Sequence, residues 1–316
     1  MANILTFGEP MALLMAEEYG PLKDVPLFRR RVSGAEVNIA IGLTRLGHSV
    51  SYISRVGQDP FGAHILDFLT EQQINTRYIE VDAADRTGIQ LKEKPIDGQD
   101  PIVVNFRKGT AFSHISLDVI HTIDWQSINH LHVTGIPAGV SEKARRALNL
   151  LMDTARARQI PISFDPNLRP SLWKSKEEMV HTINEFAAKA NIVLPGIGEG
   201  NILTGHDDAE TIADTYLARG IDTVIVKLGA IGAFTKCSDG SSFHTPGFPV
   251  KEVIDTVGAG DGFAVGVLSA LLEGRSLADA VQRGTAIGAR SVMTAGDNEG
   301  LPTSQQLEAF LLQEGK

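Results

Sequence analysis

The segment Asp255-Thr256-Val257-Gly258-Ala259-Gly260-Asp261 places three small residues and a carboxylate where a strand or loop leads into a helix. The helix is indicated by apolar residues at helical spacing from Phe263 to Leu272, with Gly274 as a stop. The small residues let the backbone turn sharply and present amide N–H groups at the helix N-terminus. That end carries about half a positive charge and suits an anion such as phosphate. The segment therefore predicts an anion site.

Asp261 gives this predicted site a chemical function. A carboxylate beside a bound phosphate is electrostatically costly, and a general base that takes a proton from an attacking hydroxyl would justify it. The alternative is an ordinary helix start, in which Asp261 only complements the helix dipole. A dinucleotide-binding fingerprint does not fit, because its third glycine would fall on Phe263. The segment favours a phosphoryl-transfer site.

The composition is that of an ordinary globular protein, with 316 residues, 43% hydrophobic and 21% charged. A net charge of -9 argues against nonspecific nucleic-acid binding. Cys237 is the one cysteine, so no internal disulfide can form and a reducing compartment is expected. Residues 1–7 lack the features of a signal peptide, and the apolar run 263–272 is too short to span a bilayer. We expect a cytoplasmic protein without nucleic-acid or membrane partners.

Apolar runs alternate with helical patterns along most of the chain. This alternation predicts an α/β fold with a doubly wound, mainly parallel sheet covered by helices on both faces. We expect one domain over residues 1–316. The predicted strands are Ile4–Phe7, Val50–Ser54, Tyr78–Val81, His130–Thr134, Pro161–Asp165, Asn191–Leu194 and Thr223–Val226. The predicted helices are Gly34–Leu46, Phe61–Gln72, Ser141–Arg158 and Lys176–Ala190, besides the helix after Gly260.

Two segments, at about 11–32 and 87–108, break this alternation. The first lacks helical periodicity and the second contains two alternating, strand-like stretches. Both indicate a small antiparallel excursion from the main sheet. Because ligands of α/β enzymes bind at the carboxyl ends of the strands, such an excursion could cover the site as a lid. A hairpin without function is the alternative.

Two further segments, one at the start of a predicted helix and one after a predicted strand, carry polar side chains that could bind a ligand. Gly34 and Asn38 open a helix, where a ligand could approach the backbone and Asn38 could donate and accept hydrogen bonds. Arg169 follows a strand between two prolines, which suits a bidentate contact to a carboxylate or phosphate. The alternatives are helix capping for the first segment and a salt bridge from Arg169 to Asp165 for the second.

Three more positions carry charge or glycine at the ends of strands. Lys227, Gly229 and Gly232 follow a buried strand, and the glycines would let backbone approach a nucleotide, although a plain hairpin turn also explains them. Arg107 closes the second lid strand, where a solvated edge is the alternative. Glu199 lies in a glycine-rich turn and could hold metal-bound water. The shared position of these residues, after strands and beside glycines, favours one common site.

Taken together these segments resemble the ribokinase-like (PfkB-type) carbohydrate kinase family. The resemblance covers essentially the whole chain and rests on the segment 255–261, on Gly47 with the segment 55–62, and on Lys227-x-Gly229-x-x-Gly232. Within the family, segments 34–38, 106–109 and 296–302 most resemble 2-keto-3-deoxygluconate kinases. The segment 164–169 followed by Leu172-Trp173 resembles both those enzymes and fructokinases.

The resemblance implies an ATP-dependent kinase with a doubly wound core and a small β-strand lid, through which the chain would form a homodimer. Asp261 would take the proton from the primary hydroxyl of the sugar as it attacks the γ-phosphate, and the amides of Gly258, Ala259 and Gly260 would hold the developing charge.

The resemblance also implies roles for the flanking residues. The sugar acid would contact Gly34, Asn38, Gln90, Asn105, Arg107, Arg169 and Asp261, with the two arginines suited to its carboxylate. The nucleotide would contact Lys227, Gly229, Gly232, Gly258, Gly260 and Thr285. Mg²⁺ would bridge the phosphates of ATP, with Glu199 reaching it through water, and activation by a monovalent cation is left open.

The chain departs from the family pattern at three places. The positions of Gln90 and Asn105 are commonly tyrosines in 2-keto-3-deoxygluconate kinases. The family's Asn-x-x-Glu magnesium motif has become Gly196-Ile197-Gly198-Glu199, and Thr285 stands where an Asn often faces the nucleotide. The expected substrate is 2-keto-3-deoxygluconate. The alternatives are a neutral ketose, as in a fructokinase, and a noncatalytic regulator that binds sugar and nucleotide.

Overall fold

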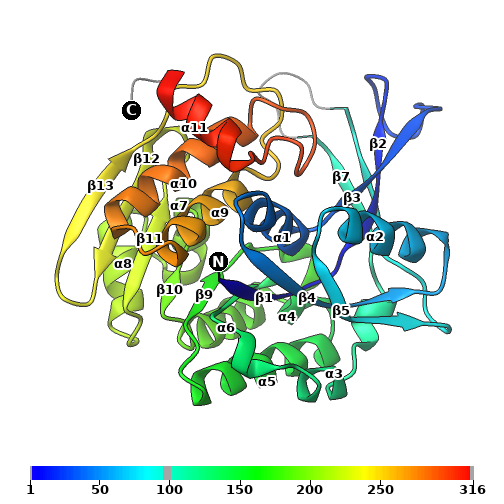
Figure 1. Cartoon of the computed structure of the whole chain (residues 1–316), viewed down its shortest axis with the longest axis horizontal. Coiled ribbons are helices and arrows are strands. Elements are labelled where there is room, and N and C mark those ends of the chain that lie inside the picture. The colour runs from blue at the N-terminus through cyan, green and yellow to red at the C-terminus, as the bar shows by residue number, and fades with distance from the viewer. Residues whose placement is uncertain (1, 95–100, 314–316) are drawn as a thin grey trace.

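The structure, a computed structural model, describes residues 2–94 and 101–313, and within these it contains two β-sheets of different size (Figure 1). The large sheet has nine strands in the order β13-β12-β11-β10-β9-β8-β1-β4-β5. All neighbours from β5 to β11 pair in parallel, while β12 and β13 add an antiparallel edge. The strands are β1 Asn3–Phe7, β4 Ser49–Gly57, β5 Asn75–Asp82, β8 His130–Thr134, β9 Ile162–Asp165, β10 Ile192–Val193, β11 Thr223–Lys227, β12 Gly232–Cys237 and β13 Ser242–Pro246.

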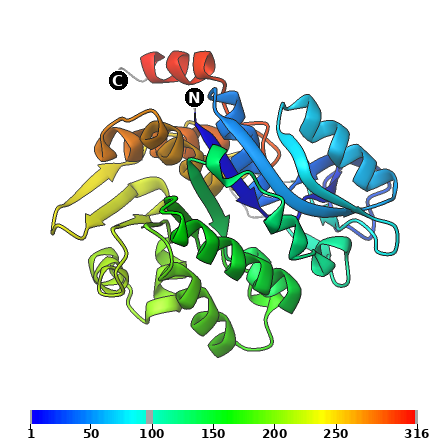
Figure 2. The same cartoon turned by 60° about the horizontal axis from the view of Figure 1, so that its bottom comes forward.

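Helices cover both faces of the large sheet (Figures 1 and 2). One face carries α5 Glu142–Ala157, α6 Lys176–Ala187, α7 Ile197–Thr204 and α8 Ala209–Leu217, and the short helices α3 Asp118–His121 and α4 Ile136–Val140 lie on the same side. The other face carries α1 Ala35–Arg45, α2 Pro60–Glu71, α9 Ala259–Leu272, α10 Leu277–Ser291 and α11 Ser304–Gln313. Single 3₁₀ turns occupy Ala111–His114, Trp125–Ser127, Pro170–Leu172 and Gly229–Ile231. The expected α/β fold, with a mainly parallel sheet between two helical layers, is confirmed.

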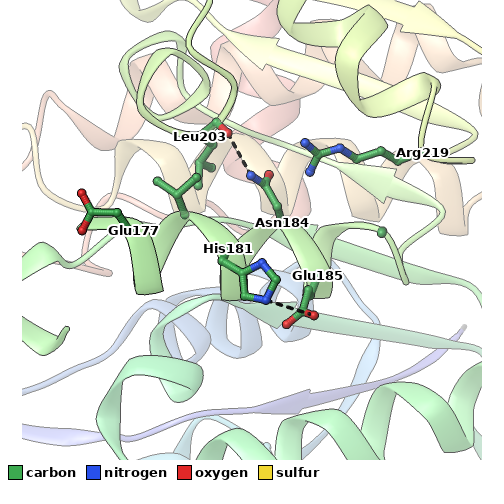
Figure 3. A pocket seen from close by; sticks show the side chains of 8 residues that line it. Glu177, His181, Asn184, Glu185, Leu203 and Arg219 are labelled. Atoms are coloured by element: carbon green, nitrogen blue, oxygen red, sulfur yellow. Dashed lines mark hydrogen bonds and ion pairs between the residues drawn. The ribbon is translucent and has the colours of Figure 1, made fainter. Parts of the chain in front are cut away.

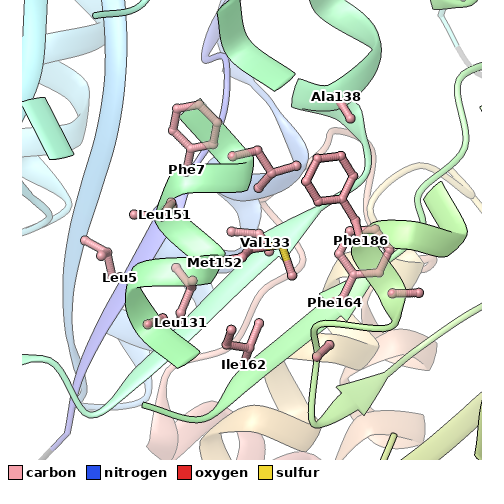
Figure 4. Packing of buried hydrophobic residues seen from close by; sticks show 14 of the residues in the cluster. Leu5, Phe7, Leu131, Val133, Ala138, Leu151, Met152, Ile162, Phe164 and Phe186 are labelled. Carbon is pink, nitrogen blue, oxygen red and sulfur yellow. The ribbon is translucent and has the colours of Figure 1, made fainter. Parts of the chain in front are cut away.

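Two hydrophobic cores lie on the two faces of the large sheet, and successive residues of a buried strand pack alternately into one core and the other. Leu5 and Phe7 of β1 pack toward α5, together with Val133 of β8 and Phe164 of β9 (Figure 4). Ile4, the neighbour of Leu5, packs instead with α1, α9 and α10. This alternation is what a strand covered on both faces requires, and it explains why the strands read as continuous apolar runs. Within the described residues no helix is both long and apolar enough to cross a membrane.

The smaller sheet, named the lid, lies at the two segments expected to form one. Its strands are β2 Met11–Ala16, β3 Phe28–Ser33, β6 Ile89–Lys92 and β7 Val103–Phe106, in the order β3-β2-β6-β7. That it covers the site stays a prediction. Residues 95–100 of the predicted segment 87–108 lie outside the described residues. The expectation of a purely antiparallel excursion is wrong. Two antiparallel hairpins join through a parallel pairing of β2 with β6. The β2–β3 hairpin follows β1 and the β6–β7 hairpin follows β5. Because β1 and β5 run in the same direction in the large sheet, β2 and β6 also start in the same direction.

Candidate active site

The N-terminus of α9 is shaped by a glycine that no other residue could replace without strain. Gly258, the N-cap, has a left-handed φ of 84°. A Cβ at this position would lie 2.4 Å from the carbonyl oxygen of Asp297, so the loop that contains Asp297 packs directly against the helix start. Left-handed backbone with such a close neighbour requires glycine. The glycine at position 258 of the segment 255–261 is therefore required by the structure itself.

The first turn of α9 presents its amides as the sequence predicted. The first regular bond of the helix runs from the amide of Gly262 to the carbonyl of Gly258 at 2.8 Å. The amide of Ala259 makes only a long bond of 3.4 Å to the carbonyl of Thr256. Amides of a first turn have no acceptor within their own helix, so they can bind an anion. The ammonium of Lys227 adds positive charge, because it lies 3.6 Å from the point where a Cβ of Gly260 would be.

Asp261 lies in the same turn and is oriented by two amide side chains. Its Oδ2 accepts a hydrogen bond from Asn38 Nδ2 at 2.8 Å, and its Oδ1 accepts one from Asn167 Nδ2 at 3.3 Å. Burial raises its pKa from 3.8 to about 6, although the Asn38 hydrogen bond and the charges of Arg169 and Lys227 oppose that rise. A carboxylate with this pKa is ionised at neutral pH, yet it is a better proton acceptor than an exposed aspartate.

Lys227 and Asp165 form a buried ion pair beside Asp261. They end β11 and β9, which flank β10, and Lys227 Nζ lies 2.5 Å from Asp165 Oδ2. Burial raises the pKa of Asp165, and the charge of Lys227 opposes the rise. The alternative salt bridge from Arg169 to Asp165 is therefore wrong. The guanidinium of Arg169 is exposed and donates to the carbonyl of Leu168 at 3.0 Å.

Glu199 lies in the first turn of α7, at the position predicted to be a glycine-rich turn. Its Oε2 accepts from the amide of Gly196 at 2.8 Å and its Oε1 from the amide of Leu168 at 2.7 Å. The carboxylate therefore ties the loop before Arg169 to α7. In the described part of the chain no group of three His, Cys, Asp or Glu side chains could hold a metal ion. A contact of Glu199 to Mg²⁺ through water stays a prediction.

The predicted nucleotide residues lie at two other elements. Gly229 and Gly232 form the turn of the β11–β12 hairpin, with φ of 62° and 117°. A Cβ on Gly232 would lie 2.0 Å from the carbonyl oxygen of Thr245, so packing against β13 alone already explains this glycine. Thr285 is buried in α10 and donates to the carbonyl of Gln282 at 2.8 Å. Nucleotide contacts of all three residues stay predictions.

Arg107 is held by the carboxylate of Glu9, which was not among the predicted site residues. Its Nε donates to Glu9 Oε2 at 2.8 Å, and Glu9 Oε1 accepts from Thr110 Oγ1 at 2.6 Å. The side chain of Arg107 is only 7% exposed, so the alternative of a solvated edge is wrong. Glu9 follows the buried strand β1, and this position at the carboxyl end of a strand was the signal that could have identified it.

The remaining predicted sugar contacts lie on α1 and on the lid. Gly34, the N-cap of α1, has a φ of 141°, and Asn38 follows it by one turn. Asn298 Nδ2 donates to Asn38 Oδ1 at 3.4 Å, behind the contact of Asn38 to Asp261. Gln90 and Asn105, opposite each other on β6 and β7, are joined by a hydrogen bond of 2.8 Å. The two amides that stand where tyrosines were expected thus form one cross-strand pair.

A surface hollow elsewhere in the molecule does not belong to this site. It lies against α6 and is lined in part by His181, Asn184, Glu185 and Arg219 (Figure 3). Asn184 Nδ2 donates across it to the carbonyl of Leu203 at 2.8 Å. None of the predicted site residues is among the residues that line this hollow.

Comparison with known proteins gives consistent results. Residues 1–304 match the model of the pfkB family carbohydrate kinase. The chain is 46% identical to a 2-dehydro-3-deoxygluconokinase of Bacillus subtilis, over 98% of this chain and 95% of that enzyme. A PfkB protein from Polaromonas sp. JS666 has a similar structure, with a TM-score of 0.87, 43% identity and coverage of 98% of this chain and 99% of that one.

Two ligand-bound structures are also similar. A putative ribokinase II from E. coli in complex with ATP and Mg²⁺ has a TM-score of 0.89, 27% identity, and coverage of 99% and 100%. A fructokinase double mutant from Vibrio cholerae O395, with fructose, ADP and potassium ion bound, has a TM-score of 0.86, 26% identity, and coverage of 98% of both chains.

Proposed function

The chain belongs to the pfkB family of carbohydrate kinases, and on that premise we propose that it transfers the γ-phosphate of ATP to the primary hydroxyl of 2-keto-3-deoxygluconate. The observation that carries the substrate is the 46% identity to the Bacillus subtilis enzyme, since 2-dehydro-3-deoxygluconokinase is another name for a kinase of this sugar acid. The position of Asp261 between the α9 amides and two orienting asparagines supports the reaction. Membership of a kinase family favours an enzyme over a noncatalytic regulator.

In the proposed mechanism Asp261 removes the proton of the attacking hydroxyl. The amides of Asn38 and Asn167 occupy defined sites on its two oxygens and so fix the direction of the carboxylate. The first-turn amides of α9 and the ammonium of Lys227 stabilise negative charge that develops on the transferred phosphoryl group. The proton ends on Asp261, whose pKa of about 6 lets it return the proton to water at neutral pH.

The two arginines are proposed to bind the carboxylate of the substrate. The guanidinium of Arg169 is exposed and bonds to backbone carbonyls, so its charge is not paired with an acid there. Arg107 is oriented by Glu9 through Nε, which fixes the plane of its guanidinium. A planar guanidinium meets a carboxylate with two parallel hydrogen bonds. Burial raises the pKa of Glu36, a buried side chain near Asp261, and the charges of both arginines oppose that rise.

ATP and Mg²⁺ are the proposed co-substrate and metal, as in the E. coli relative. The described residues fit a metal held mainly by the nucleotide, because the nearby carboxylates of Asp165 and Glu199 already accept bonds from Lys227 and from backbone amides. When bound, Mg²⁺ would neutralise phosphate charge. Glu199 would reach it through water.

A fructokinase-like activity is the second candidate, and the Gln90–Asn105 amide pair favours it. Two amides are shorter and more polar than the tyrosines expected there, which suits hydroxyl groups of a neutral ketose. The 26% identity to the Vibrio cholerae fructokinase is compatible with this reading but is lower than the identity to the Bacillus enzyme.

The chain is proposed to be a single kinase domain. Two copies of it are proposed to form a homodimer through their lids. Side chains alternate between the two faces of a strand, so Gln90 and Asn105 lie on one face and Val104 and Phe106 on the other. Phe106 is 58% exposed, and Tyr19 and Leu27 of the same sheet region are also exposed. A second lid would cover these apolar side chains. Use of ATP supports a cytoplasmic setting.

The test is ADP release from ATP and Mg²⁺ with three acceptors in parallel: 2-keto-3-deoxygluconate, fructose and 2-ketogluconate. We expect strong turnover on the keto-deoxy acid and weak turnover on fructose. Turnover on fructose alone would overturn the substrate while keeping the reaction. A chain that binds neither ATP nor any of the sugars in calorimetry would overturn the kinase assignment.

A further inference from the structure

A lysine of the lid is completely buried against two carboxylates next to the anion site. Lys92, the last residue of β6, has 0% exposure. Its Nζ lies 2.7 Å from Asp255 Oδ2 and 2.9 Å from Asp297 Oδ1. Burial alone would lower the pKa of Lys92, but the charges of Asp297 and Asp255 raise it above its usual value. The ammonium is therefore a permanent positive charge in the interior.

The two carboxylates belong to the segments that shape the start of α9. Asp255 Oδ1 accepts from the amide of Val257 at 3.1 Å, and its Oδ2 accepts from the amide of Gly296 at 3.1 Å. The carbonyl of Asp297 lies against Gly258, the N-cap of α9. One ammonium thus holds together the chain before the helix and the loop that packs on its first residue.

The same loop is connected to the catalytic carboxylate. Asn298 follows Asp297, and its Nδ2 donates to the carbonyl of Val32 at 3.0 Å and to Asn38 Oδ1 at 3.4 Å. Asn38 in turn donates to Asp261. A displacement of the loop would therefore reach both the anion site and the orientation of Asp261.

Buried carboxylates require a compensating charge, since an unpaired ion in the interior is strongly unfavourable. Here the ammonium of Lys92 supplies that charge, and Lys92 belongs to the lid strand β6. We propose that Lys92 is a positioning residue whose ammonium acts as a built-in monovalent cation, holding residues 255–258 and 296–298 in the geometry of the anion site. The wild-type enzyme consequently needs no added potassium for this purpose. This inference rests on the proposed kinase function.

The experiment compares Lys92→Ala, Lys92→Met and Lys94→Ala with the wild-type chain, in tetramethylammonium chloride and in potassium or methylammonium chloride. Alanine leaves room for a small cation between the carboxylates, whereas methionine fills that room without charge. Lys94→Ala is the matched control, because Lys94 lies just after β6 and bonds to the carbonyl of Glu17 away from the anion site. Turnover and thermal unfolding are measured in each salt.

We expect equal wild-type kcat in all salts and an unchanged Lys94→Ala enzyme. Lys92→Ala should lose about 10²-fold in kcat, as misplaced catalytic groups do, with a much smaller change in sugar KM. Potassium or methylammonium should restore part of that kcat and raise the unfolding temperature of Lys92→Ala, but not of Lys92→Met. The thermal readout applies even to a variant too weak for kinetics.

The following results would overturn the inference. A Lys92→Ala enzyme with wild-type kcat would show that the ammonium does not position the site. Equal rescue of Lys92→Met would reveal a general salt effect, and a wild-type requirement for potassium would show that Lys92 does not replace an added cation. A wild-type chain that turns over no sugar in any salt would instead count against the proposed function. If Lys92→Ala fails to fold even in potassium, the double variant Lys92→Ala/Asp297→Asn restores the wild-type charge of the cluster; wild-type kcat in that variant would also overturn the inference.

Discussion

Replacement of Asp261 by Ala should inactivate the enzyme and at the same time reduce the stability that the folded state loses as the pH rises from 5 to 8. The loss of a general base lowers kcat by about 10²-fold or more. The stability effect follows from burial, which disfavours the ionised carboxylate in the folded chain and raises its pKa from 3.8 to about 6.

The magnitude follows from the linkage between pKa and folding. For an acid with a raised folded-state pKa, stability is fully present below pH 3.8 and is lost as the pH rises through about 6. Complete ionisation then corresponds to at most about 3 kcal/mol, of which roughly 1.4 kcal/mol is lost between pH 5 and pH 8. The variant lacks this loss. Loss of the bonds to Asn38 and Asn167 lowers stability at both pH values. The change of the Asn38 bond with ionisation is already contained in the pKa of about 6, so it adds no further pH dependence to this comparison.

The assay is urea unfolding of wild type and variant at these two pH values, followed by circular dichroism, with kcat measured on the same preparations. Asp279→Ala is the matched control, because Asp279 lies in the first turn of α10 but is exposed and distant in sequence from the α9 terminus. It should keep activity and show no such pH difference. Unchanged kcat in Asp261→Ala would refute the catalytic base. A stability difference independent of pH would refute the explanation by burial.

Three further substitutions separate the roles of neighbouring residues. Arg169→Ala should raise KM for the acid substrate about tenfold or more, the scale of one charged hydrogen bond, in steady-state assays; an equal rise for fructose would contradict carboxylate recognition. Gly258→Ala should lower kcat and the unfolding temperature, because a Cβ would lie 2.4 Å from the Asp297 carbonyl at a φ of 84°, whereas Gly240→Ala, with a φ of 87° and no atom within 4 Å of its Cβ, should lower only stability. Glu199→Gln should raise the Mg²⁺ concentration needed for half-maximal activity; if only the unfolding temperature changes, Glu199 is a structural cap.

The elements of the large sheet were predictable because their causes are local. The predicted helix 61–72 became α2 Pro60–Glu71, where Asp59 caps two amides, and the run Thr223–Val226 became β11 with one residue added. The edge strands β12 and β13 and the parallel joining of the lid were not predicted. The pairing of two hairpins that are far apart in the sequence depends on the direction of the large-sheet strands that precede them. No local sequence pattern predicts that pairing.

The site was predictable as far as its motif residues extended. Asp261 and Asn38 were expected and the structure brings them within 2.8 Å. Glu9 was missed although it follows a buried strand, and Lys92 was missed because a charged residue within an alternating strand is expected to face solvent. Only the packing of Asp255 and Asp297 over Lys92 turns it into an interior residue.

The order of strands also has a consequence for biosynthesis. β1 is translated first, yet it lies between β4 and β8, and Lys92 must wait for partners 163 and 205 positions further along the chain. A nascent polypeptide on the ribosome therefore carries a lid whose lysine can only face water until nearly the whole chain has emerged. Contacts of such long sequence separation form late. Phosphate binding competence should thus appear at the end of folding, and a truncated chain that stops before residue 297 should not acquire it.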